Sequence, residues 1–133
     1  MRTRLTTAAI LGLAAALTTG CSSGAGLNAV TDKEAHVYDE PFDRKSDLAH
    51  GTPYFGPEEK WNLPPGSAIT VECRVPKTWH ITDPSGANSD KPNDFLKISY
   101  DDGGGYVESS YVTITSRDED TNSPIRADEV ETC

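Results

Sequence analysis

The stretch Ile69-Thr70-Val71-Glu72-Cys73-Arg74-Val75 decides the fold class of this chain. Apolar residues and cysteine alternate in it with polar residues, and this period of two is typical of a strand that buries one face. Pro64-Pro65-Gly66 precedes the stretch and Pro76 follows it, and such residues commonly punctuate strands. The pattern therefore predicts a half-buried β-strand from Ser67 to Val75.

The same period appears downstream of this strand. Residues 95–100 alternate, with Leu96, Ile98 and Tyr100 on one face. Asp101-Asp102-Gly103-Gly104 follows, and these residue types tolerate the positive φ of a tight hairpin. Further short strands are predicted over residues 106–107 and 112–115 and, upstream, over 35–38. No stretch after the first twenty residues has a clear helical period, so the sequence predicts an all-β fold, either a small barrel or a sandwich.

The segment Gly105-Tyr106-Val107-Glu108-Ser109-Ser110-Tyr111-Val112 resembles the closing segment of a Src homology 3 domain. That segment reads Gly, aromatic, aliphatic, Pro or small, Ser, any residue, Tyr, then Val or Leu. Three earlier segments, 36–39, 63–71 and 95–98, are similar to earlier strands of the bacterial versions and come in the right order. The resemblance implies a small five-stranded Src homology 3-like barrel over residues 35–115. Glu108 stands where the family commonly has Pro, so the resemblance implies the barrel rather than proline-peptide binding.

The first twenty residues are typical of an export signal. Arg2 and Arg4 precede an uncharged apolar run from Leu5 to Leu17, and this run is too short for a comfortable membrane span. The following Leu-Thr-Thr-Gly-Cys ending at Cys21 resembles the signal of bacterial lipoproteins, which implies removal of residues 1–20 and lipidation of Cys21. The alternative is an ordinary signal peptide cleaved near Gly20. We expect residues 21–34 to form a flexible tether and the location to be the extracytoplasmic face of the cell membrane.

Three cysteines are an odd number for an exported chain. If Cys21 carries lipid, Cys73 and Cys133 remain as a pair in an oxidising compartment. A bond between them would close a loop of about 60 residues and stabilise the fold by roughly 4 kcal/mol. The alternative is two unpaired thiols.

The 133-residue chain has a formal charge of −9 and contains only 35% hydrophobic residues. These values exclude a polytopic membrane protein, and the lack of basic clusters argues against nucleic acid as a partner. Removing residues 1–20 removes Arg2 and Arg4 and no acidic residue, so the charge falls from −9 to −11. We expect two long loops, 39–63 and 76–93, and an acidic, strand-poor tail over 116–133 that only a disulfide at Cys133 would order.

No arrangement of residues predicts an enzyme, a metal site or a cofactor. His36, His50 and His80 are scattered, although a pairing of His80 with Asp83 stays open. The run from Asp83 to Asp90 offers oxygen ligands but lacks the spacing of a helix-flanked calcium loop, and a polar surface turn is the simpler interpretation.

Aromatic residues are the best candidates for binding. Tyr38, Phe95 and Tyr111 occupy positions that line the groove of the family that the sequence resembles, and Trp61 and Trp79 lie near the ends of the long loops. Acidic residues near them favour a ligand that bears Lys, Arg or an amino group; these are Asp39, Glu40, Asp43, Glu58 and Glu59. The alternative is that these aromatic side chains belong to the core.

The sequence thus predicts a lipid-anchored binding module without catalytic activity. Because bacterial members of the resembled family often engage the cell wall, the first expectation is recognition of a cell-wall peptide or a wall-associated protein. The alternative is a structural or regulatory lipoprotein that docks on a membrane or envelope protein without using a peptide pocket.

Overall fold

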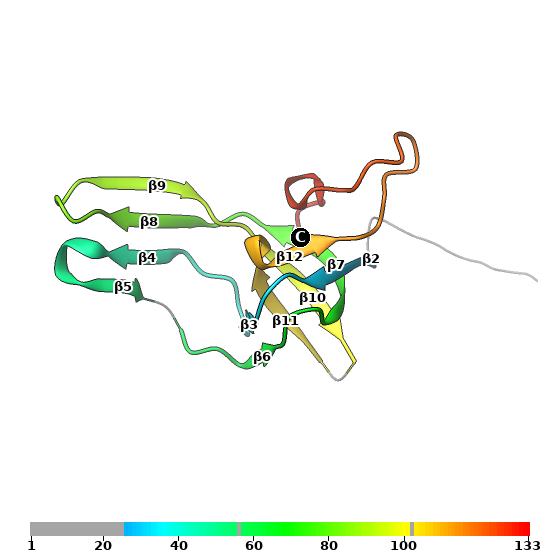
Figure 1. The fold of residues 1–133 in the computed structure, drawn as a ribbon, viewed down its shortest axis with the longest axis horizontal. Helices are drawn as coiled ribbons and strands as arrows, with labels where there is room; N and C mark the ends of the chain where they lie inside the picture. Colours follow the sequence, from blue (N-terminus) through cyan, green and yellow to red (C-terminus); the bar gives the residue numbers. More distant parts are fainter. Residues whose placement is uncertain (1–25, 56, 102) are drawn as a thin grey trace, which may run out of the picture.

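The computed structural model describes residues 26–55, 57–101 and 103–133, with side chains left undescribed for 52–55 (Figure 1). The predicted signal peptide and the predicted lipidation site at Cys21 lie outside the described residues. Within these ranges, no helix is long and apolar enough to cross a membrane. The described chain is predominantly β, as predicted, and its helical elements are short 3-10 turns.

A five-stranded antiparallel sheet has the order β11-β10-β7-β2-β12. Its strands are β2 (Leu27–Thr31), β7 (Ala68–Val75), β10 (Phe95–Tyr100), β11 (Gly103–Glu108) and β12 (Val112–Ile114). The strands predicted around residues 67–75, 95–100, 106–107 and 112–115 are confirmed. The described residues contain no ladder between the edge strands β11 and β12, which the 3-10 turn η3 (Ser109–Tyr111) connects.

The central strand β7 buries the face that its alternation predicts at its first half. Ile69 and Val71 are buried, whereas Cys73 and Val75 are half-buried. On the neighbouring strand β10, Leu96 and Ile98 are buried and Lys97 is exposed. These four buried side chains of β7 and β10 join one hydrophobic cluster with residues from β2, β3, β6, β11 and β12.

The strand β2 lies where a flexible tether was predicted over 21–34. Its inward residues Ala29 and Thr31 are 3% and 2% exposed. The Thr31 hydroxyl donates to the Pro64 carbonyl at 2.8 Å and accepts from the Ser67 N–H at 2.9 Å. Small and polar inward residues give a weak apolar alternation, and this explains why the sequence pattern missed the strand.

A short ribbon of β3 (Ala35–Val37) and β6 (Trp61–Leu63) packs on the sheet. Tyr38 continues from β3 and exchanges two backbone hydrogen bonds of 2.9 Å with Tyr106 of β11. A Cβ atom on Gly105 would lie 2.6 Å from a Val37 methyl group and 2.7 Å from the Tyr38 carbonyl oxygen. This close approach accounts for the glycine at position 105.

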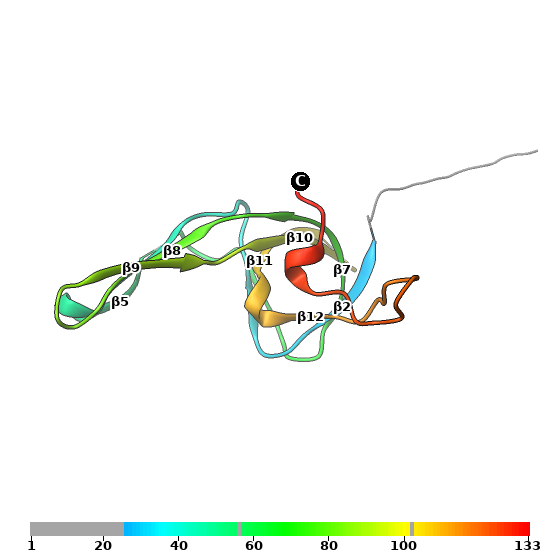
Figure 2. The ribbon, with the colours of Figure 1, turned by 90° about the horizontal axis from the view of Figure 1, so that it is seen from above.

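The prediction that residues 39–63 and 76–93 form long loops is wrong, because each segment contains a hairpin. The first holds β4 (Arg44–Asp47), the 3-10 turn η2 (Leu48–His50) and β5 (Thr52–Phe55), and the second holds β8 (Thr78–Thr82) and β9 (Asn88–Pro92). Parallel pairing of β4 with β8 joins them into a four-stranded sheet of order β5-β4-β8-β9. We call this sheet the arm. It projects from the core on the side opposite to β2 (Figures 1 and 2).

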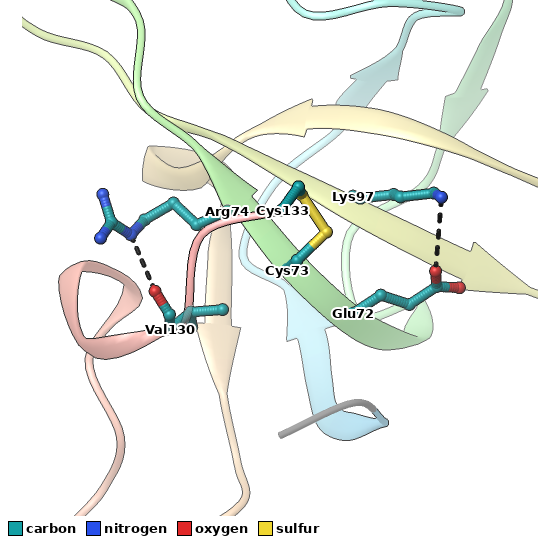
Figure 3. Close-up of a disulfide and its surroundings, with 6 residues drawn as sticks. All are labelled: Glu72, Cys73, Arg74, Lys97, Val130 and Cys133. Carbon is teal, nitrogen blue, oxygen red and sulfur yellow. Dashed lines mark hydrogen bonds and ion pairs between the residues drawn. A yellow bond between two sulfur atoms is a disulfide. The ribbon is translucent and has the colours of Figure 1, made fainter. Parts of the chain in front are cut away.

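The C-terminal tail is held by more than its disulfide (Figure 3). Cys73 and Cys133 are bonded, with Cα atoms 4.9 Å apart, as the cysteine count predicts. Arg74 donates from Nε to the Val130 carbonyl at 3.0 Å, and its backbone bonds to Glu131 and Cys133. Val130 is 4% exposed and belongs to the core cluster. The expectation that only the disulfide orders the tail is therefore wrong.

Candidate functional site

Two of the four predicted groove residues are core residues. Phe95 is 0% and Tyr38 is 4% exposed. Phe42 packs against both, with ring centroids 5.0 Å from Phe95 and 4.8 Å from Tyr38. The prediction that Tyr38 and Phe95 line a ligand surface is therefore wrong, and the alternative of core packing holds for them.

A buried polar network lies next to these aromatic rings. Glu108 is 3% exposed and accepts hydrogen bonds from Arg44 Nη1 at 2.9 and 3.1 Å and from Asn93 Nδ2 at 2.7 Å. Burial lowers the pKa of Arg44, but the hydrogen bond and attraction to Glu108, with a smaller contribution from Tyr111, raise it above its usual value. Glu108 therefore fastens the first strand of the arm to β11.

Tyr111 and Trp79 serve as contact points for cations of the same chain. Tyr111 is half-buried, and Lys33 Nζ lies 4.7 Å from the centre of its ring. Trp79 lies in the arm between Arg44 and Lys91, at 4.4 and 4.3 Å from its ring centre. The rings of Tyr111 and Trp79 are thus already contacted by cations of the chain itself.

Trp61 is the predicted groove residue that remains exposed, at 57%. It shares a face of β6 with Leu63, because residues two apart on a strand point to the same side. Leu63 is buried in the core, whereas Trp61 is exposed, and both residues line a hollow of about 700 Å³. Ala68, Tyr100 and Asp101 line the same hollow. Tryptophan is among the residue types that dominate the energetics of binding interfaces.

A second hollow of about 370 Å³ adjoins the first, because both are lined by Ala68, Tyr100 and Asp101. Its further walls come from the central strands and include Asn28, Thr70 and Ser99. We call the two hollows together the Trp61 groove. It has an aromatic, apolar part at Trp61 and a polar part at Asn28, with Tyr100 in common.

The groove is lined by two charged residues, Lys60 and Asp101, which differ in their surroundings. Lys60 Nζ donates to the Gly104 carbonyl at 3.1 Å and lies 3.3 Å from an Asp39 oxygen. Asp101 is exposed and lines both hollows. Asp101 is therefore the charged residue that the two hollows share.

The predicted acidic residues do not gather around Trp61. Asp43 accepts the Thr78 N–H at 3.0 Å, and Glu59 lies 3.0 Å from His36 Nδ1. The others, Asp39, Glu40 and Glu58, line a separate hollow of about 300 Å³ next to Phe42. The expectation that these acidic residues lie together near the aromatic residues therefore holds only for the three around Phe42.

The histidines lie apart and each pairs with a carboxylate. His50 Nδ1 is 2.7 Å from Asp47, and His80 Nδ1 is 2.8 Å from Asp90 rather than from Asp83. The hydrogen bond from His50 lowers the pKa of Asp47. No group of three metal-ligating side chains was found among the residues that the structure describes.

The run from Asp83 forms a hairpin turn. Asp83 Oδ1 accepts hydrogen bonds from the Ser85 hydroxyl at 2.6 Å, the Ser85 N–H at 2.9 Å and the Ala87 N–H at 3.0 Å. The Ser85 hydroxyl and the Ala87 N–H are the main causes of a lowered pKa of Asp83. This carboxylate stabilises the turn between β8 and β9.

Sequence reasoning missed Tyr100 as a groove residue and Arg44 as the partner of Glu108. The alternation of β10 assigns Tyr100 to the buried face, and only its position at the strand end suggests partial exposure. No local signal links Arg44 to Glu108, which is 64 residues away. No protein-family model, curated protein or solved structure significantly matches this chain.

Proposed function

We propose that this protein is a lipid-anchored, extracytoplasmic binding module without catalytic activity, built on a Src homology 3-like barrel. The strand order supports the barrel, since β7, β10 and β11 form a meander and a 3-10 turn leads into β12. The arm is then an elaboration of two barrel loops. The signal-like residues 1–20 and Cys21 support the anchor.

The observation that carries the binding proposal is the exposed Trp61 over the Trp61 groove. In the described chain, Trp61 and Leu48 are the large hydrophobic residues that remain exposed. Trp61 belongs to the core-facing side of β6, yet no core covers it. A ligand that covers the ring would remove a large apolar area from water, worth about 25 cal/mol for each Å².

The ligand that fits this groove is an extended peptide with an amino or guanidinium group. Asp101 offers a carboxylate, and the rings of Trp61 and Tyr100 offer faces that attract cations. The charge of −11 after removal of residues 1–20 would speed the approach of such a ligand. A cell-wall peptide or a wall-associated protein satisfies these requirements.

Retention on purified insoluble cell wall tests this proposal. The chain from residue 21, with Cys21→Ser to remove the lipid site, is compared with its Trp61→Ala and Leu48→Ala variants at low and moderate salt. We expect Trp61→Ala to weaken retention by about 30-fold, because truncating a central aromatic residue commonly costs about 2 kcal/mol. Leu48→Ala is the matched control and should bind like the parent. Equal retention of all three would overturn the assignment of the groove.

The arm supports a second candidate, docking on a membrane or envelope protein. All five β8 residues are half-buried and all five β9 residues are exposed, so nothing in the described chain fully covers this sheet. Leu48 is 43% exposed on the arm. This candidate predicts the reverse result in a crosslinking assay in intact cells, namely that Leu48→Ala loses the partner and Trp61→Ala keeps it.

A further inference from the structure

The Trp61 groove begins where the described chain begins. The Gly26 N–H donates to the Val71 carbonyl at 3.2 Å, and Leu27 starts β2. Asn28, two residues further, lines the polar hollow together with Thr70. The arm, by contrast, lies at the other end of the molecule (Figures 1 and 2). A lipid anchor attached upstream of β2 would therefore lie nearer to the groove than to the arm.

The tether between this end and the proposed anchor is short. Because β2 starts at Leu27, only residues 22–26 separate Cys21 from the strand, instead of the tether over 21–34 that the sequence predicts. Five residues span at most about 18 Å when fully extended. Asn28 lies seven residues after Cys21, so a lipid on Cys21 would keep Asn28 and the polar hollow within about 25 Å of the membrane surface.

This inference rests on the proposed peptide-binding groove but assigns its ligand to a membrane protein rather than to the cell wall, so wall retention and the vesicle assay below separate the two sources. We propose that the Trp61 groove binds a positively charged, extended segment of a membrane protein immediately outside the bilayer. A partner fixed in the same membrane meets the groove at a high effective concentration, and this concentration falls as a tether grows longer than the span that it has to cover.

The charges of the groove favour a cationic segment. Asp101 lines both hollows, while the ammonium group of Lys60 already contacts Gly104 and Asp39. A Lys or Arg side chain could place its charge at Asp101 and its stem on Tyr100 and Trp61. An extended backbone would follow the groove from Trp61 towards Asn28.

The same observations disfavour the bilayer itself as the ligand. Peripheral insertion uses a broad apolar face with basic residues around it. Leu48, the other exposed large hydrophobic residue of the described chain, lies on the arm and not beside Trp61. A charge of −11 is repelled by anionic lipids.

The test uses the lipidated chain with Trp79→Phe, so that Trp61 is the sole tryptophan reporter. It is placed in phosphatidylcholine vesicles that also carry a lipid-linked peptide of alternating Lys and Ser, and the Trp61 emission is followed as the surface density of peptide rises. A second form has about 20 Gly and Ser residues inserted after Ser23. Effective concentration falls roughly as the −3/2 power of tether length, so the longer tether should weaken the response about tenfold. The same peptide free in solution should bind both forms equally.

Each outcome decides one part of the inference. Equal responses of the two tether lengths to the lipid-linked peptide would overturn membrane proximity and leave the groove intact. No Trp61 response to either form of the peptide would overturn the cationic membrane partner, whereas retention on purified cell wall tests the proposed function separately. A response to vesicles without peptide would assign the groove to the bilayer, and equal binding of a lysine-acetylated peptide would overturn the cationic partner.

Discussion

The buried network of Arg44, Glu108 and Asn93 should decide whether the arm stays fixed to the core. We consider Arg44→Met, which removes the guanidinium group but keeps an unbranched stem against Trp79. The Glu108 side chain, 3% exposed, would keep the Asn93 amide and lose the Arg44 charge. Breaking a buried ion pair by removing one partner costs about 3–5 kcal/mol. Because the Arg44 side chain is 19% exposed, we expect the lower end, about 3 kcal/mol.

Urea unfolding at pH 7, followed by far-ultraviolet circular dichroism and tryptophan emission, measures this loss. The double variant Arg44→Met with Glu108→Gln should recover part of it, because no buried charge is left unpaired and the side-chain oxygen at position 108 still accepts the Asn93 hydrogen bond. Arg126→Ala is the matched control, because Arg126 is 71% exposed and pairs at the surface with Asp128 at 3.1 Å. We expect less than about 1 kcal/mol for it. A loss below about 1 kcal/mol for Arg44→Met, or no recovery in the double variant, would refute the role of the network.

Three further predictions follow from contacts elsewhere. Cys133→Ser should lower the free energy of unfolding by roughly 4 kcal/mol, because it opens the loop back to Cys73, and an unchanged urea midpoint would contradict this. Gly105→Ala should cost about 1–3 kcal/mol from its clash with Val37. Gly103→Ala should cost little, because its added methyl group would lie 3.5 Å from the Tyr100 hydroxyl oxygen, and equal thermal midpoints of the two variants would count against the close approach. The lowered pKa of Asp83 means that its ionised carboxylate stabilises the turn at pH values above the usual pKa of 3.8. This stabilisation is lost as the pH falls through the lower pKa that Asp83 has in the folded state. Acid titration of the turn amides should therefore change in Asp83→Ala, and identical titrations would refute it.

Much of the central sheet could be predicted, because its strands bury one face and leave the other polar. Residues 68–75 and 95–100 carry that alternation and form β7 and β10. The arm strands β4 and β9 could not be predicted in this way, since β9 is exposed throughout and the one buried residue of β4 is the polar Ser46. Their pairing is set by contacts between distant segments, such as Arg44 with Glu108, that leave no local pattern.

The candidate site shows the same division. Trp61 could be identified from its residue type and its position near a loop end, but burial separates it from Tyr38 and Phe95, which carry the same aromatic signal. Phe42 covers those two rings because the arm brings its own chain over them. An aromatic residue in a sequence does not reveal which side chain will cover it, and this information comes only from the tertiary structure.

The most direct test of the binding proposal is a nuclear magnetic resonance titration of the two tryptophan indole N–H groups. The chain from residue 21, with Cys21→Ser, is titrated with soluble peptides released from purified cell wall and, separately, with the peptide of alternating Lys and Ser. The indole N–H of Trp79, which donates to Ser46 Oγ at 2.9 Å, serves as the internal control. Binding in the Trp61 groove predicts a saturable shift of the Trp61 resonance with at least one of these ligands and a constant Trp79 resonance. A constant Trp61 resonance with both ligands, or a shift of Trp79 alone, would contradict it.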